Sequence, residues 1–155
     1  MGQTGSSLLE LLRSRRMKVE EVNASKLMRR WSRVFHATQW DDLDYELREG
    51  RAIEHYRDLR ASSFLIIRGY PRGRLEALRC SHPLLEYEIL ASIHNEVNLD
   101  ELYVIEESFA WTFILSHEMY SLCPGPIFAV PYTQRPPRPE RRSGKKRNLR
   151  GRAGS

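Results

Sequence analysis

The sequence has only two cysteines in 155 residues, Cys80 and Cys123, which are too few for a disulfide framework. We therefore expect both to be thiols in a reducing compartment. It also lacks an uninterrupted apolar run of about 18 residues, and the longest candidate, residues 109–122, is too short and carries charge. The leucine-rich start is broken by Glu10 and several arginines, unlike a secretory signal. These absences predict a single cytosolic domain without a membrane span.

Motifs for catalysis and metal binding are missing as well. The five histidines are scattered, and no His-Glu-x-x-His motif, phosphate-binding glycine loop or nucleophile elbow occurs. A zinc site could be drawn from Cys80, His82, His117 and Cys123, but this spacing matches no common zinc finger. We therefore predict no catalytic residue, no metal site and no cofactor.

Lysine and arginine are absent from residues 80–134, which hold eight acids, although the whole chain has a formal net charge of +5. By contrast, residues 1–36 hold eight basic and three acidic side chains, and residues 135–155 hold nine basic side chains and one acid. The acids are most simply solvated faces, or a docking surface for the basic tail or a basic partner. Basic ends on an acidic body favour local contacts with anionic partners over general polyanion binding.

Apolar residues recur at helical spacing through much of residues 8–133, and we predict a mainly α-helical, compact domain of four or five helices. The best-marked helix runs from Ala24 to about Phe35, because Asn23 can cap it while Val22 and Leu27 occupy hydrophobic-staple positions. Other helical segments are expected over residues 8–19, 38–59, 74–79, 83–97 and 98–122, the last of them supplying the centre of the core.

Residues 62–69 are the exception, since they contain a short apolar run of strand-favouring residues that ends in a turn. Their expected partner is the segment 127–132, although Pro126 and Pro131 limit it to an edge or extended role. The basic tail, residues 134–155, is rich in Pro, Arg, Lys, Gly and Ser and is expected to be disordered.

The first seven residues fit the pattern that directs N-myristoylation after removal of Met1. Gly2 supplies the free amine, Gln3 an uncharged neighbour and Ser6 a hydroxyl group at the required distance. The same composition is also typical of an ordinary frayed terminus. We predict that residues 1–7 form a flexible acylation signal.

A polybasic patch generally accompanies a myristoyl group, because a single acyl chain binds membranes only marginally. Eight basic side chains follow Gly2 and are interpreted as a face that meets the anionic inner leaflet. They are Arg13, Arg15, Arg16, Lys18, Lys26, Arg29, Arg30 and Arg33. The alternative is that these residues are only solvent-facing positions on helices.

The tail carries a second basic array. Its polyanion-binding or import-receptor-binding candidates are Arg141, Arg142, Lys145, Lys146, Arg147, Arg150 and Arg152. Such arrays bind nucleic acid, anionic lipid or nuclear import receptors, or simply confer solubility. No aromatic residue lies within the tail to stack on bases, which argues against sequence-specific recognition of single strands. The prolines at 136–139 also permit a polyproline II ligand.

The opening Met1-Gly2-Gln3-Thr4, the leucine-rich segment and the basic run that ends at Trp31 resemble the start of retroviral Gag matrix domains. The resemblance implies myristate on Gly2 and contact between the basic residues 13–33 and the inner leaflet. It ends at Phe35, and the basic C-terminal tail departs from a matrix domain.

Together these features predict a non-enzymatic, N-myristoylated peripheral membrane protein on the cytoplasmic face of a cellular membrane. It would be a viral matrix-like or accessory protein that recruits a polyanion or an unknown protein partner. The alternative is a nuclear or RNA-associated regulatory protein that binds nucleic acid or an import receptor through its tail, with Gly2 incidental.

Overall fold

A computed structural model describes residues 7–69, 75–97, 100–116 and 126–134, which are built around one antiparallel sheet. Its seven strands are ordered β1-β4-β3-β5-β6-β7-β2. They are β1 (Val19–Glu21), β2 (Leu47–Arg48), β3 (Phe64–Gly69), β4 (Glu76–Cys80), β5 (Glu101–Glu106), β6 (Thr112–Leu115) and β7 (Ile127–Ala129). The prediction of a mainly α-helical fold is therefore wrong, and the chain has an α/β fold.

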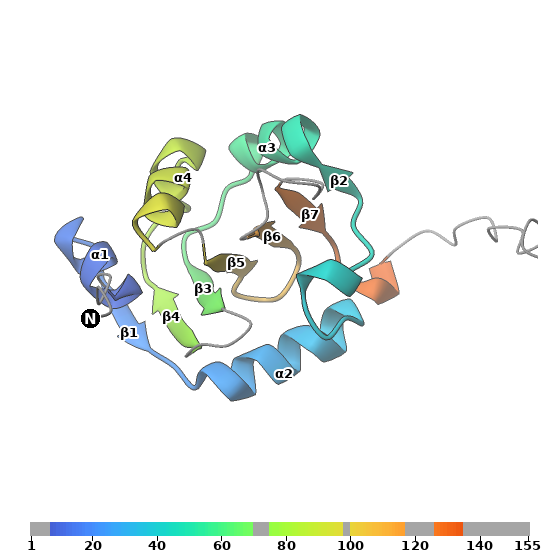
Figure 1. The fold of residues 1–155 in the computed structure, drawn as a ribbon, viewed down its shortest axis with the longest axis horizontal. Helices are drawn as coiled ribbons and strands as arrows, with labels where there is room; N and C mark the ends of the chain where they lie inside the picture. The colour runs from blue at the N-terminus through green and yellow to red at the C-terminus, as the bar shows by residue number, and fades with distance from the viewer. Residues whose placement is uncertain (1–6, 70–74, 98–99, 117–125, 135–155) are drawn as a thin grey trace, which may run out of the picture.

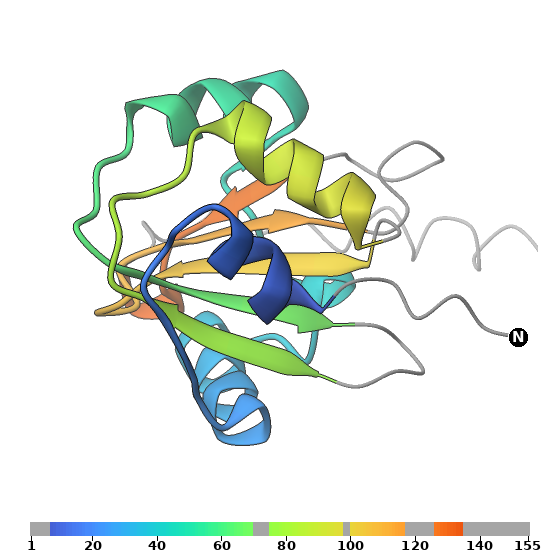
Figure 2. The ribbon, with the colours of Figure 1, turned by 90° about the vertical axis from the view of Figure 1, so that its left-hand side faces the viewer.

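Helices cover both faces of this sheet (Figures 1 and 2). The helices among the described residues are α1 (Leu8–Ser14), α2 (Ala24–Phe35), α3 (Glu49–Asp58) and α4 (Tyr87–Glu96). The first, third and fourth lie on one side, called here the three-helix face, and α2 lies on the other, called the α2 face. Two short 3₁₀ turns, η1 (Trp40–Asp42) and η2 (Tyr132–Gln134), lie near the end of α2 (Figure 1).

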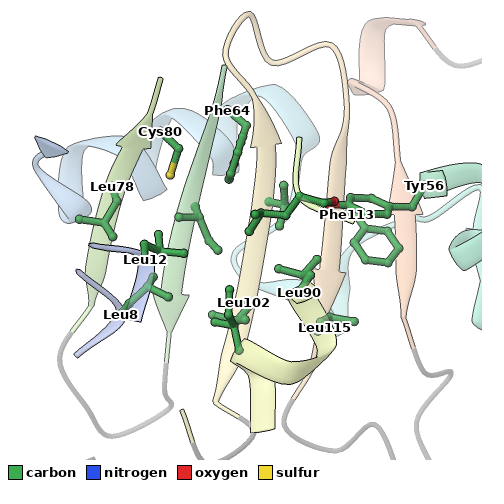
Figure 3. Close-up of a cluster of buried hydrophobic side chains, with 14 of the residues drawn as sticks. Leu8, Leu12, Tyr56, Phe64, Leu78, Cys80, Leu90, Leu102, Phe113 and Leu115 are labelled. Carbon is green, nitrogen blue, oxygen red and sulfur yellow. The ribbon is translucent and has the colours of Figure 1, made fainter. Parts of the chain in front are cut away.

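Each central strand is buried on both sides, because successive side chains point to opposite faces of a sheet. In β3, Phe64 and Ile66 join the core of the three-helix face, whereas Leu65 and Ile67 join the core of the α2 face. Figure 3 shows the first of these cores, in which side chains of α1, α3 and α4 lie over those of β3 to β6. The sheet is thus the middle of three layers.

The helix expected over residues 98–122 is replaced by the hairpin of β5 and β6. Both faces of these two strands are covered, so that nearly every position is buried and apolar. On a helical wheel the same residues spread around the whole circumference. Phe109 has a positive φ of 63° in the connecting turn, and the Glu106 side chain accepts hydrogen bonds from the backbone N–H groups of Ser108 and Ala110. Residues 117–122 lie outside the described residues.

Two further helical predictions are wrong in whole or in part. Residues 76–80 form β4 instead of a helix, because they pair with β3 on one side and β1 on the other. The segment 38–59 is helical only from Glu49, and its first part forms η1 and the edge strand β2. The strand predicted over residues 62–69 is confirmed as β3, but its partners are β4 and β5, while β7 pairs with β6 and β2.

Three helical predictions hold, although two of the helices are shorter than expected. The bounds of α2 agree with the prediction, whereas α1 ends at Ser14 and α4 begins at Tyr87. In the described part of the chain, no helix combines the length and apolar character that crossing a bilayer requires. The predicted tail, residues 134–155, lies outside the described residues apart from Gln134.

Candidate polyanion-binding surface

The amphipathic helix α2 carries the candidate surface, and its start is fixed by a local cap. The side-chain oxygen of Asn23 accepts a hydrogen bond of 2.9 Å from the backbone N–H of Lys26. At the other end, His36 has a left-handed conformation with φ 53°, and its backbone N–H donates a hydrogen bond to the carbonyl oxygen of Ser32. Asn23 and His36, which flank the helix in the sequence, therefore take part in hydrogen bonds that cap its two ends.

The inner side of α2 holds the helix in one rotational position. Trp31 and Phe35 are fully buried, and the indole Nε1–H of Trp31 donates a hydrogen bond of 3.2 Å to Oγ1 of Thr112 on β6. Trp31 also meets Tyr103 of β5 edge to face, with ring centroids 5.1 Å apart. This anchoring orients the opposite side of the helix outward.

The outer side of α2 is a stripe of four cations, called here the α2 stripe: Lys26, Arg29, Arg30 and Arg33. All four are exposed, and among the described residues none has a carboxylate oxygen within 4 Å. Their spacing creates like-charge neighbours three and four residues apart, at a combined cost of roughly 1–2 kcal/mol to the helix. Lys26 also lies in the first turn, where a positive charge opposes the helix dipole.

Four cations elsewhere in the described structure, Arg15, Arg57, Arg68 and Arg79, form ion pairs with acids, whereas Arg13, Arg16, Lys18, Arg48, Arg51 and Arg60 have no carboxylate oxygen within 4 Å among the described residues. Arg68 of β3 donates to Asp100 at 2.9 Å and lies 3.4 Å from a carboxylate oxygen of Glu76. Arg79 of β4 lies between two carboxylates, 2.8 Å from Glu20 and 2.7 Å from Glu107. The hydrogen bonds with Glu20 and then Glu107 raise the pKa of Arg79. These pairs connect strands with neighbouring strands or with residues at the ends of β5, whereas the α2 stripe has no such partner among the described residues.

One member of the stripe is held by an aromatic ring. The guanidinium carbon of Arg30 lies 4.1 Å from the centroid of Phe109, in the turn between β5 and β6. Phe109 in turn stacks with Phe35, with centroids 6.5 Å apart. A cation over a ring is attracted to it and keeps its charge. Arg30 is therefore positioned without being neutralised.

The eight cations predicted as one membrane-facing surface are divided between the two faces of the sheet. Arg13, Arg16 and Lys18 are exposed near α1, whose Leu8 and Leu12 belong to the core of the three-helix face. Arg15 is partly buried there, 3.5 Å from a carboxylate oxygen of Glu96 on α4. The structure brings together only the four cations of α2.

The remaining predicted site residues lie outside the described residues: Gly2, Gln3, Ser6, Arg141, Arg142, Lys145, Lys146, Arg147, Arg150 and Arg152. The points where their segments join the described structure are both close to α2. Ser7 shares a hollow of about 680 Å³ with Asn23 and Ala24 at the start of α2. At the other end, Tyr132 of η2 stacks on His36, with ring centroids 4.1 Å apart.

Cys80, from the zinc set considered above, lies in the core of the three-helix face (Figure 3). Burial raises the pKa of its thiol to about 12. His117 and Cys123 fall outside the described residues, and within those residues no three His, Cys, Asp or Glu side chains are grouped to hold a metal.

One polar cluster was not predicted, because Glu101 was interpreted as part of a solvated helix face. Glu101 is buried, and its Oε1 accepts a hydrogen bond of 2.6 Å from the indole Nε1–H of Trp40. The backbone N–H of Trp40 donates to the hydroxyl oxygen of Tyr103 at 3.0 Å. Burial, followed by the charge of Glu101, raises the pKa of Tyr103. These bonds attach the chain after α2 to the sheet and support the position of the helix.

Comparison with family models, with curated proteins and with solved structures yielded no match. The similarity of the first 35 residues to a Gag matrix domain therefore stays a prediction.

Proposed function

We propose that this protein is a non-enzymatic peripheral membrane protein in which the Gly2 acyl group and the α2 stripe are two membrane-binding signals. The observation that carries the proposal is the stripe itself: four exposed cations on a well-anchored helix, without a carboxylate partner in the described structure. An anionic surface would relieve the repulsion that these cations impose on one another.

The binding strengths expected for the acyl chain and for the α2 stripe suit a protein that needs both signals to attach stably. A single myristoyl chain gives a binding constant of about 10⁴ M⁻¹, which is marginal and reversible. Each cation close to an anionic leaflet adds about 1 kcal/mol, so that four would strengthen binding about a thousandfold. The cytoplasmic leaflet is the anionic one, which agrees with the proposed location on the cytoplasmic side of a membrane.

The test uses the full chain in eukaryotic cells, with the membrane-bound fraction as the readout. Gly2→Ala removes the acyl acceptor, and a fourfold Gln variant of Lys26, Arg29, Arg30 and Arg33 removes the stripe. We expect each to lower the membrane-bound fraction at least tenfold.

A matched control removes the same charge from the opposite face. Arg48, Arg51, Arg57 and Arg60 are exposed in or beside α3, and their fourfold Gln variant changes the net charge equally. We expect it to keep most of its membrane binding. Equal losses from both fourfold variants would show that the α2 stripe acts only through the net charge of the protein. Normal membrane partitioning of Gly2→Ala would show that acylation plays no part in membrane binding.

The second candidate is a nuclear or RNA-associated regulator, and it is favoured by the nine basic residues of the segment 135–155. Deleting this segment should then abolish nuclear entry and RNA retention. Persistence of both after the deletion would rule out this candidate.

A further inference from the structure

Exposed hydrophobic side chains are rare on the described surface, and the two large ones both flank α2. Leu75 is 40% exposed and Tyr132 is 52% exposed. Leu75 immediately precedes β4, and Tyr132 begins η2. Single exposed apolar residues need no explanation in general, but their shared position beside a stripe of cations does.

Leu75 forms one wall of a shallow hollow along α2. The hollow measures about 680 Å³, and its other walls come from Met28, Arg29, Ser32 and Arg33, together with the start of the helix. The apolar side chain therefore lies directly beside two cations of the α2 stripe. A surface that combines a hydrophobic side chain with arginines suits the boundary between phospholipid headgroups and acyl chains.

Tyr132 lies at the C-terminal end of α2. Its ring stacks on the imidazole of His36 with an interplanar angle of 10°, so that one ring face is covered while about half of the side chain stays exposed. Tyrosine is enriched at membrane interfaces because its ring is apolar and its hydroxyl group can remain hydrated. The stripe therefore has an aliphatic group alongside it, next to Arg29 and Arg33, and an aromatic group at its C-terminal end, on His36.

Resting on the membrane function proposed above, we infer that the α2 face inserts into the headgroup region of an anionic phospholipid bilayer, with Leu75 and Tyr132 as two hydrophobic anchors. The helix axis then lies along the membrane surface, and the stripe contacts the lipid phosphates and carboxylates. A nucleic acid backbone offers phosphates but no apolar layer for Leu75, so the pair of anchors favours lipid.

This orientation also agrees with how the chain ends are attached. The described structure begins at Ser7, which lines one hollow with Asn23 and Ala24 at the start of α2, and ends at η2, whose Tyr132 stacks on His36 at the end of the helix. Gly2 is five residues before Ser7, within about 17 Å along an extended chain. The two ends of the described structure therefore both adjoin α2.

Vesicle binding by the full, non-acylated chain tests the anchors directly. Vesicles of phosphatidylcholine with phosphatidylserine are the probe, and pure phosphatidylcholine is the reference. We expect Leu75→Ser and Tyr132→Ser each to weaken binding to the anionic vesicles about tenfold, and the double variant more. Leu59→Ser, which alters a partly buried leucine on the three-helix face, should bind as the unmodified chain does.

Salt separates insertion from simple adsorption. Electrostatic attraction is screened at high ionic strength, whereas burial of apolar groups persists. We expect part of the unmodified protein to stay bound at high salt and the double variant to be released completely. Circular dichroism and thermal unfolding of each variant verify that the fold is retained.

The possible results distinguish the two proposals. If the unmodified chain binds anionic vesicles and both Ser variants bind equally well, the anchors are wrong while the membrane function stands. If the chain does not bind the vesicles but binds a single-stranded RNA through the α2 stripe, both proposals are overturned. A tenfold loss shared by Leu59→Ser would overturn the specific role of the α2 face.

Discussion

The two faces of the sheet are covered to different extents. Three helices lie over one face, and two cations of that side form ion pairs between elements, Arg15 with Glu96 and Arg57 with Glu88. On the other face, α2 is the only α-helix that the structure describes, its four cations have no carboxylate partner there, and Leu75 and Tyr132 remain exposed.

The two faces distinguish cations that pair within the fold from cations that remain available for a partner. In an ion pair between two elements of the fold, each charged side chain has a fixed partner within the protein. Exposed pairs of this kind contribute only about 0–1 kcal/mol, so the protein loses little by keeping them. Among the described residues the α2 stripe has no carboxylate partner that offsets the repulsion between its cations, and an external anion would do so.

Truncation of Phe35 should have the largest effect, because α2 covers its face with a few large side chains. Phe35 is fully buried and its ring lies 5.6 Å from that of Trp31. We expect Phe35→Ala to lower the free energy of unfolding by about 3–5 kcal/mol in a denaturant titration. Arg33→Ala, on the exposed side of the same helix, should change it by less than about 0.5 kcal/mol. A loss below about 1 kcal/mol for Phe35→Ala would mean that α2 is only loosely attached.

Cys80, in the core of the three-helix face, should make the free energy of unfolding decrease in alkaline solution. Because burial raises the pKa of this thiol from 9.0 to about 12, the folded state disfavours the thiolate. Its contribution to stability is complete below about pH 9 and falls by about 1.4 kcal/mol per unit as the pH rises toward 12.

We therefore expect the Cys80→Ala variant to lose about 2 kcal/mol less stability than the unmodified chain between about pH 8 and about pH 10.5. Burial also raises the pKa values of Tyr56 and Tyr103. Both tyrosines are present in the two proteins, so their contributions cancel in the comparison. Parallel pH profiles of the unfolding midpoint would contradict the buried position of the thiol.

Removal of the helix cap tests how far α2 depends on its own sequence. Asn23→Ala takes away the acceptor for the Lys26 N–H and should destabilise the protein by about 1 kcal/mol. The control is Asn95→Ala, at an exposed position inside α4, where alanine is neutral or slightly favourable. Similar denaturation midpoints for both variants would show that tertiary contacts alone hold the start of α2.

Reversal of one charge in the stripe should have a small effect on stability and the opposite sign. Lys26→Glu removes like-charge contacts and places an acid in the first turn, and should raise the free energy of unfolding by about 0.5 kcal/mol. The same change should weaken binding to anionic vesicles. Arg51→Glu reverses a charge at the corresponding position of α3 and should leave vesicle binding unchanged. A destabilised Lys26→Glu would refute the idea that the stripe costs stability.

The correct and incorrect predictions differ in the range of the interactions involved. The helix α2 was predicted from Asn23, the spacing of its apolar residues and its cations, and each of these acts within about four residues. The segment 101–115 was predicted as a helix because an apolar residue at almost every position suits both a buried helix and a strand covered on both faces. Only the pairing of β5 with β3 and β6 decides between them.

Local sequence is sufficient to specify α2, its cap and the run of cations on its polar side, because a helix forms its hydrogen bonds within one segment. The tertiary structure decided which cations meet acids, since Arg57 and Glu88 are 31 residues apart and Arg79 and Glu20 are 59 apart. It also placed Leu75 and Tyr132 at α2, although they belong to distant segments. Strand pairing and ion pairs depend on where remote residues meet, and burial of both faces of the sheet supplies the free energy that brings them together.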